Sequence, residues 1–247
     1  MAIAQEWIVI PRPAAAARFV LYCLPYAGGS LHIYTPWASR LAPELEVRAI
    51  QLPGHDMRIA EPPFSQFRPL VVNLAHVVAN DIDRQFAIFG HSMGALVAFE
   101  LVRELRRQGF ALPKRLLISG FRAPHLAIRH RPLHRLRDEG LLRALRRLGR
   151  ITDEVMANSE VISLFLPLLR AELTLTEAYA YTPEVPLACP ISVFAGRDDP
   201  VVSYDEVDQW HRHSSMEVRI HSFPGGHFFI LDAPGPVLDA IRRDVAT

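Results

Sequence analysis

The sequence lacks a strong charge of either sign. Its 27 Lys and Arg residues are balanced by 26 Asp and Glu residues, which leaves a formal net charge of +1. Proteins that bind nucleic acid or adhere to an anionic membrane surface usually carry a basic excess. We therefore expect neither nucleic acid nor membrane as a partner.

Long apolar runs and cysteines are also scarce. No segment has the roughly 18 uninterrupted apolar residues of a membrane span, and Pro11 and Pro13 interrupt the N-terminal stretch that a signal peptide would need. The two cysteines, Cys23 and Cys189, both lie in apolar stretches. This predicts buried free thiols in a reducing compartment, and hence a cytoplasmic protein.

Length and composition suit one large α/β domain. Of the 247 residues, 50% are hydrophobic and 21% are charged, so a sizeable core is available. Short apolar runs alternate with helical patterns, which predicts a mostly parallel sheet with helices on both faces. The expected strands are 7–10, 19–24, 47–52, 86–89, 116–120, 191–196 and 217–223, and the helices between and after them are 30–42, 67–83, 92–108, 205–213 and 237–245.

This alternation stops between residues 121 and 181. The stretch has no good strand candidate, but it has helical patterns at 139–148 and 159–181. We interpret 121–181 as a helical lid, inserted between a first part of the core at 1–120 and a second part at 182–247. The apolar residues between 161 and 169 are expected to pack over a substrate chamber.

One stretch carries the pattern of a catalytic serine. An apolar run leads into Gly90-His91-Ser92-Met93-Gly94, and an amphipathic helical pattern follows. In a nucleophile elbow the serine sits on such a strand-to-helix turn, with its hydroxyl above the end of the sheet. Glycines lack a Cβ atom, so Gly90 and Gly94 let the strand and the helix approach closely. We predict Ser92 as a nucleophile.

A catalytic serine needs a histidine to take its proton and an acid to orient that histidine. After an elbow, the acid precedes the histidine in the chain. His227 follows the last expected strand, and Asp198 and Asp199 follow the strand before it. Because such loops usually place the carboxylate three residues after a glycine, here Gly196, we predict Asp199 as the acid, with Asp198 as the alternative.

Acyl transfer also needs two backbone N–H groups to stabilise an oxyanion. One belongs to the residue after the nucleophile, which is Met93, and the other to the loop after an early strand. That loop is Tyr26-Ala27-Gly28-Gly29, and we predict Ala27 as the donor. The loop lacks the G-x-G-x-x-G spacing of a dinucleotide site.

Two histidine pairs raise the alternative of a metal site. These are His211 with His213, and His130 with His134. Neither pair has cysteines or carboxylates nearby at a recognisable ligand spacing. We interpret them as solvated histidines and expect neither a metal nor a cofactor.

With these residues in hand, the chain resembles the type II thioesterases of the α/β-hydrolase fold, the stand-alone editing enzymes of polyketide and nonribosomal peptide synthesis. The resemblance covers essentially the whole chain. It is carried by residues 24–30, 52–55 with Arg58, 90–94, 119–125, 164–172 and 225–228. One position departs from the family, because many relatives have arginine where this chain has His55. The contribution of this position to the site is therefore open.

The resemblance implies hydrolysis of thioesters on the phosphopantetheine arm of an acyl or peptidyl carrier protein. Such a reaction removes misprimed or stalled acyl groups and restores the carrier. The resemblance also implies Ser92, Asp199 and His227 as the catalytic triad, with Ala27 and Met93 at the oxyanion positions.

The first half of the expected lid is strongly basic. Nine arginines lie between residues 122 and 150, against Asp138 and Glu139. They are Arg122, Arg129, Arg131, Arg135, Arg137, Arg143, Arg146, Arg147 and Arg150. Carrier proteins of the implied kind are acidic, so this segment is a candidate docking surface. A solvated helical face is the alternative.

Three other functions remain open. A general serine esterase or lipase would use the same triad on small oxygen esters. A chain-terminating thioesterase or cyclase is usually fused to a synthase, whereas this chain begins at Met1 with no upstream linker. A non-catalytic ligand-binding protein on a hydrolase scaffold is disfavoured, because serine, acid and histidine are all retained. Nothing in the sequence demands more than a monomer.

Overall fold

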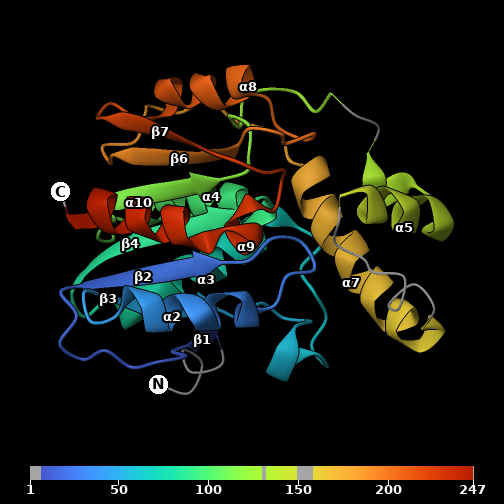
Figure 1. Cartoon of the computed structure of the whole chain (residues 1–247), viewed down its shortest axis with the longest axis horizontal. Helices are drawn as coiled ribbons and strands as arrows, with labels where there is room; N and C mark the ends of the chain where they lie inside the picture. The colour runs from blue at the N-terminus through green and yellow to red at the C-terminus, as the bar shows by residue number, and fades with distance from the viewer. Residues whose placement is uncertain (1–6, 130–131, 149–157, 247) are drawn as a thin grey trace.

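The strands form one sheet that is parallel except for one short outermost strand. A computed structural model describes residues 7–129, 132–148 and 158–246. In the described chain the strand order is β1-β3-β2-β4-β5-β6-β7, and only β1 pairs antiparallel, with β3 (Figure 1). The strands are β1 (Ile8–Val9), β2 (Phe19–Leu24), β3 (Leu45–Ile50), β4 (Gln85–His91), β5 (Arg115–Ser119), β6 (Ile191–Gly196) and β7 (Val218–Phe223). The expected mostly parallel sheet is confirmed.

Helices cover both faces of this sheet (Figure 1). One face carries α2 (Thr35–Leu41), α9 (Phe229–Asp232) and α10 (Pro234–Ala246), and the other carries α3 (Phe67–Asp81) and α4 (Met93–Arg107). Strand β2 divides its side chains between the two cores: Tyr22 and Leu24 join one, and Leu21 and Cys23 join the other. A strand buried on both faces reads as a continuous apolar run, which is why these segments could be recognised.

Several elements differ from their expected bounds. The helix expected at 30–42 is a 3-10 turn, η1 (Leu31–Tyr34), followed by α2, with the Ser30 hydroxyl accepting a hydrogen bond from the His32 N–H at 3.2 Å. Strand β3 begins two residues early, because its ladder with β2 starts at Leu45. The helix expected at 205–213 is α8 (Tyr204–Asp208) and a 3-10 turn, η4 (Gln209–His213). Local periodicity therefore located the elements but not their ends.

The chain between β5 and β6 is helical in its described part. It contains η3 (Leu133–Arg135), α5 (Asp138–Arg147) and α7 (Ser159–Glu177). Figure 1 shows α5 and α7 beside one end of the sheet. Four buried leucines form a separate small core there: Leu141, Leu145, Leu166 and Leu169. Val161 and Leu164 at the start of α7 are 43% and 73% exposed, so the apolar run at 161–169 is only partly packed.

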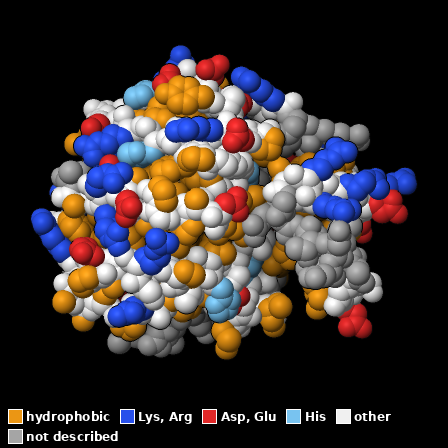
Figure 2. All heavy atoms as spheres, viewed as in Figure 1, with side chains coloured by type: hydrophobic (Ala, Val, Ile, Leu, Met, Phe, Trp, Pro, Cys, Tyr) orange, Lys and Arg blue, Asp and Glu red, His pale blue; other side chains and the backbone are white. Residues whose placement is uncertain are grey.

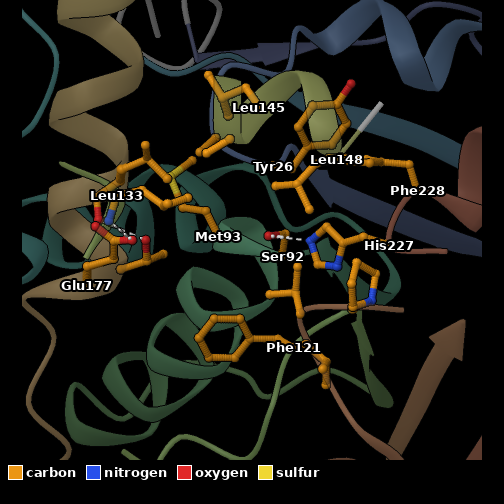
Figure 3. A pocket seen from close by; sticks show the side chains of 18 of the residues that line it. Tyr26, Ser92, Met93, Phe121, Leu133, Leu145, Leu148, Glu177, His227 and Phe228 are labelled. Atoms are coloured by element: carbon orange, nitrogen blue, oxygen red, sulfur yellow. Dashed lines mark hydrogen bonds between the residues drawn. The ribbon is translucent and has the colours of Figure 1, made fainter. Parts of the chain in front are cut away.

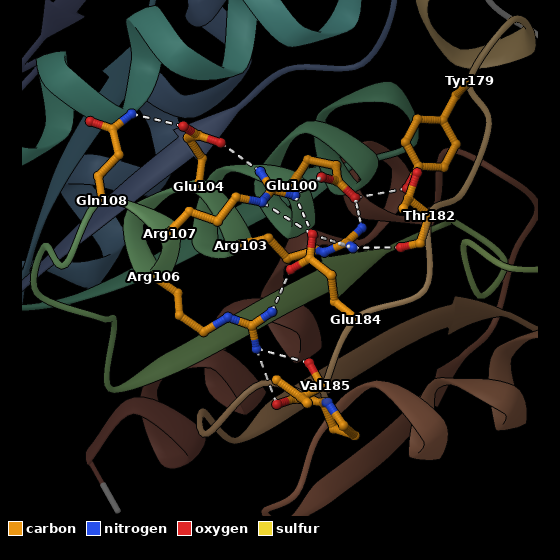
Figure 4. A network of polar contacts seen from close by, with 11 residues as sticks. Glu100, Arg103, Glu104, Arg106, Arg107, Gln108, Tyr179, Thr182, Glu184 and Val185 are labelled. Atoms are coloured by element: carbon orange, nitrogen blue, oxygen red, sulfur yellow. Dashed lines mark hydrogen bonds and ion pairs between the residues drawn. The ribbon is translucent and has the colours of Figure 1, made fainter.

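A polar network fastens the chain after α7 to helix α4 (Figure 4). The Tyr179 hydroxyl donates to Glu100 Oε1 at 2.7 Å, and Arg103 donates to the Thr182 carbonyl at 2.6 Å. Glu184 pairs with Arg106 at 2.6 Å. Arg103 is buried, so its charge is desolvated and needs these partners. Helix α7 ends at Glu177, four residues before its expected end, and the chain after it runs along α4.

Two further sequence predictions concern burial. Both cysteines are buried free thiols, as expected. Burial raises the pKa of Cys23 well above its usual range and that of Cys189 to about 12. Among the helices of the described residues, none is long and apolar enough to cross a bilayer.

Candidate active site

Ser92 occupies a strained turn between β4 and α4. Its backbone has φ 54° and ψ −117°, a conformation that non-glycine residues rarely adopt. A Cβ atom on Gly90 would lie 2.0 Å from the Gly94 carbonyl oxygen, and one on Gly94 would lie 2.3 Å from the Leu24 carbonyl oxygen. The Ser92 N–H donates to the Ser119 carbonyl at 2.8 Å, which ties the turn to β5. Only glycines on either side of Ser92 permit this approach.

His227 and Asp199 continue from Ser92 as a hydrogen-bonded chain. His227 Nε2 lies 3.1 Å from Ser92 Oγ (Figure 3), and His227 Nδ1 lies 2.8 Å from Asp199 Oδ2. The histidine and aspartate side chains are 5% and 1% exposed. The other Asp199 oxygen accepts from the Val201 N–H at 2.8 Å, which fixes the carboxylate. Asp198 is exposed, so of the two candidates it is Asp199 that lies against the histidine.

A close backbone contact brings together the loop that carries Asp199 and the loop that carries His227. Asp199 follows β6, and His227 follows β7. A Cβ atom on Gly196 would lie 2.4 Å from the Gly226 carbonyl oxygen, and the Asp198 N–H donates to the Gly225 carbonyl at 3.0 Å. Because β4, β6 and β7 are parallel, all three side chains project from the same edge of the sheet.

The two predicted oxyanion residues line the same cavity as Ser92 and His227. Met93 is the first residue of α4, where backbone N–H groups have no carbonyl one turn earlier to bond and the helix dipole favours negative charge. Ala27 lies in the loop after β2. The N–H of the next residue, Gly28, already donates to Glu172 Oε2 at 2.6 Å.

The cavity has a volume of about 340 Å³. Its walls are mostly apolar: α7 contributes Leu169 and Leu173, and α5 contributes Leu145, which is labelled in Figure 3. Glu177 lies at its edge, where the carboxylate accepts from the N–H groups of Leu133 at 2.8 Å and His134 at 2.9 Å. The described residues thus form an apolar chamber that opens beside Ser92, of a size typical of small-molecule sites.

Sequence reasoning assigned no role to Glu172 and left that of His55 open. Both side chains are buried, and His55 Nε2 lies 2.7 Å from Glu172 Oε1. Burial alone would lower the pKa of His55, but the hydrogen bond and the charge of Glu172 outweigh it, so the pKa is raised above 6.5. A signal existed in the sequence: Glu172 follows Phe165 and Leu169 by seven and three residues, so it falls on their apolar helix face.

Those histidines considered for a metal that the structure describes contact other residues. His213 is buried with its Nε2 2.8 Å from His125 Nδ1, whereas its neighbour His211 is exposed. His134 Nδ1 lies 2.6 Å from Glu177 Oε2, and His130 is outside the described residues. Among the residues that the structure describes, no three His, Cys, Asp or Glu side chains cluster as metal ligands.

Comparisons with known proteins agree with this geometry. The model of the thioesterase domain family matches residues 19–245. Linear gramicidin dehydrogenase LgrE of Brevibacillus parabrevis is 37% identical, over 92% of this chain and 87% of that protein. Thioesterase PikA5 of Streptomyces venezuelae is 37% identical, over 90% of this chain and 78% of that protein. The solved structure of BorB, the type II thioesterase from the borrelidin biosynthetic cluster, superposes with a TM-score of 0.89 at 37% identity, over 97% of this chain and 98% of that chain.

The parallel sheet, the turn at Ser92 and these structural relatives define the class of the protein as an α/β-hydrolase. Within that class the chain belongs to the thioesterase family, and it is an enzyme that hydrolyses thioesters.

Proposed function

We propose that Ser92, His227 and Asp199 are the catalytic triad of a type II thioesterase that acts on acyl groups held by a carrier protein. The observation that carries this proposal is the continuous chain of contacts from Ser92 Oγ through the imidazole to a buried carboxylate, at 3.1 and 2.8 Å. Serine, histidine and acid at these distances are the arrangement that acyl transfer needs.

The reaction proceeds in two halves. His227 Nε2 takes the proton of Ser92 as the hydroxyl oxygen attacks the thioester carbonyl carbon. The N–H groups of Met93 and Ala27 stabilise the oxyanion, the carbon–sulfur bond breaks, and His227 returns the proton to the leaving thiolate. Water then attacks the acyl-serine carbonyl carbon as His227 takes its proton. The bond from that carbon to Ser92 Oγ breaks, His227 returns the proton to the serine oxygen, and a carboxylic acid leaves. Asp199 orients the ring throughout.

The substrate follows from the cavity and the relatives. An apolar chamber beside Ser92 suits the hydrocarbon part of an acyl group. The solved relatives include type II thioesterases from the borrelidin biosynthetic cluster and from the yersiniabactin NRPS/PKS pathway, and this supports a carrier-bound acyl thioester as the substrate here. We propose that residues 121–181 form a lid whose helix α7 supplies one wall of the chamber.

Two rival functions are weaker. The name of the gramicidin relative denotes a dehydrogenase, but the loop after β2 in this chain lacks the glycine spacing of a dinucleotide site. A non-catalytic protein would have no need of the strained backbone at Ser92. A general esterase shares the triad, so only substrate preference separates it from the proposed enzyme.

The test compares one acyl group on a phosphopantetheinyl carrier protein, as a free small thioester, and as an oxygen ester. We expect the carrier-bound thioester to have the highest kcat/KM, and Ser92→Ala to lower turnover by about 10⁴-fold or more. Thermal unfolding of the variant controls for folding. Preference for the oxygen ester, with no gain from the carrier, would make the protein an esterase.

Basic residues on α5 are the candidate contact for the acidic carrier. Arg143, Arg146 and Arg147 are exposed, in the region of α5 where Lys and Arg side chains gather in Figure 2. Arg131 and Arg150 lie outside the described residues. If the patch steers the carrier, reversing Arg143 and Arg146 to Glu lowers kcat/KM about tenfold at low salt for the carrier substrate only; Arg147 is left in place because it lines the cavity. If kcat/KM for the carrier substrate depends on salt equally in the wild type and in the charge-reversal variant, steering by α5 is excluded.

A further inference from the structure

Helix α7 rests directly on two loops of the active-site edge. A Cβ atom on Gly28, in the loop after β2, would lie 2.7 Å from the ring of Phe165. A Cβ atom on Gly54, in the loop after β3, would lie 2.8 Å from Leu168 Cδ1. Both glycines have positive φ, 74° and 88°, so the two loops are shaped to let the helix approach.

Glu172 joins these two loops from the next turns of the same helix. One of its carboxylate oxygens accepts the Gly28 N–H at 2.6 Å, and the other lies 2.7 Å from His55 Nε2. The Glu172 side chain is 3% exposed. Gly28 directly follows Ala27, the proposed oxyanion donor. The bond to Gly28 therefore fixes the peptide on the far side of Ala27 and keeps the Gly28 N–H away from the substrate.

The charge of the buried carboxylate is balanced by His55. Groups that face this imidazole are Glu172 from α7 and Asp56 from its own loop, and Asp56 in turn lies 3.8 Å from His32 of η1. Asp56 also accepts from the Ser30 hydroxyl at 2.7 Å, at the end of the oxyanion loop. Both anions favour the imidazolium, which is why the pKa of His55 is raised despite its burial.

We propose that Glu172 and His55 are positioning residues that keep the oxyanion loop in its active geometry. Because the pair requires a protonated imidazole, this positioning depends on pH. The inference rests on the proposed thioesterase mechanism, in which Ala27 donates to the oxyanion. It gives α7 a second task besides lining the chamber, because moving the helix withdraws the carboxylate from Gly28.

The direction of the pH effect follows from the raised pKa. The ion pair is fully present below about pH 6.5, the ordinary histidine pKa, and is lost as pH rises through the higher pKa of folded His55. Above that point the buried carboxylate of Glu172 has no cation beside it in the pair. We expect kcat to fall on the alkaline side, while KM for a small thioester stays nearly constant, since oxyanion donors act mainly in the transition state.

The experiment measures kcat and KM for an acyl-pantetheine thioester from about pH 6 to about pH 9, the range in which histidines titrate. Glu172→Gln is expected to lower kcat about tenfold to a hundredfold with little change in KM. His55→Arg, a permanent cation, is expected to remove the alkaline fall, and His55→Gln to lower kcat throughout without that fall. His221→Gln is the matched control, because it removes a histidine–carboxylate contact of the same 2.7 Å length, with Asp244, between two residues that do not line the cavity.

A purely structural role would lower the unfolding temperature of these variants but leave the alkaline fall in place. The proposal is overturned if His55→Arg keeps the wild-type alkaline fall, or if Glu172→Gln keeps wild-type kcat at every pH. If Glu172→Gln does not fold, the two His55 variants carry the test. An inactive wild type would instead reject the thioesterase mechanism, so the two failures can be told apart.

Discussion

The edge of the sheet and the helices between β5 and β6 are built by different means. At the edge, Ser92 and His227 are positioned by backbone contacts so close that a single Cβ atom would collide, as at Gly90. In the helices, the small leucine core is supplemented by side-chain bonds such as those of Tyr179 and Glu172. The proposed chemistry takes place at the edge of the sheet, where the close backbone contacts leave no room for adjustment. The proposed chamber wall lies in the helices.

This difference has a physical basis. Backbone atoms pressed together at a strand–helix turn cannot move separately, so the geometry of a reacting group placed there is preserved. Polar side-chain contacts can break one at a time, and each contributes only about 1 kcal/mol net. A segment held in that way can shift to admit a substrate, as lids do in other enzymes.

Gly90→Ala should give the largest effect on stability. The new Cβ atom would meet the Gly94 carbonyl oxygen at 2.0 Å, which only backbone movement can relieve. We expect a loss of about 3 kcal/mol or more in the free energy of unfolding, measured by chemical denaturation, together with loss of activity.

The matched control for Gly90→Ala is a glycine in the other region. Gly140 lies inside α5, and a Cβ atom there would meet its nearest neighbour, Leu136 Cβ, at an ordinary 3.6 Å. Gly140→Ala should therefore stabilise the protein by about 0.5 to 1 kcal/mol through helix propensity. Equal effects of the two substitutions would contradict the contrast between the regions.

Acid should weaken the junction between the two regions. His213 of η4 contacts His125, which begins the chain toward the helices. Burial, followed by the charges of His125, Arg103 and Arg212, lowers the pKa of His213 to about 4. Its contribution to stability is present above the unfolded pKa of about 6.5 and is lost as pH falls toward 4, at a cost of about 2 to 3 kcal/mol.

Denaturation of His213→Gln across that pH range tests this junction. The variant should lose packing at neutral pH but show a flatter decline in acid than the wild type. His211→Gln, at the exposed neighbour, should retain the wild-type slope. If the unfolding free energy of His213→Gln falls with pH as steeply as that of the wild type, other groups cause the acid sensitivity.

Tyr179→Phe should give the smallest effect. It removes the 2.7 Å hydrogen bond to Glu100 Oε1 that holds the chain after α7 to α4. We expect a loss of about 1 kcal/mol in unfolding free energy. Relative to the wild type, amide hydrogen exchange should become faster in α7 and should change less in α4. Tyr204→Phe, at an exposed tyrosine, serves as the control. An equal change of exchange in both helices would show that the hydrogen bond does not stabilise the position of α7.

The sequence by itself determined the sheet and the candidates for the reaction. Strands buried on both faces, such as β2 and β4, read as continuous apolar runs, and the glycines around Ser92 mark a turn that few other residues allow. Asp199 and His227 could be predicted because parallel strands bring the ends of distant segments to one edge. These are consequences of local pattern and chain order.

Only the tertiary structure decided which residues support that site from a distance. Glu172 bonds Gly28 across 144 residues of sequence and His55 across 117, and His213 meets His125 across 88. Nothing in local periodicity records such contacts, because they depend on how α7 and η4 are placed on the finished sheet. A glutamate on an apolar helix face marks a buried partner, but its identity is set only when packing brings a donor within hydrogen-bond distance.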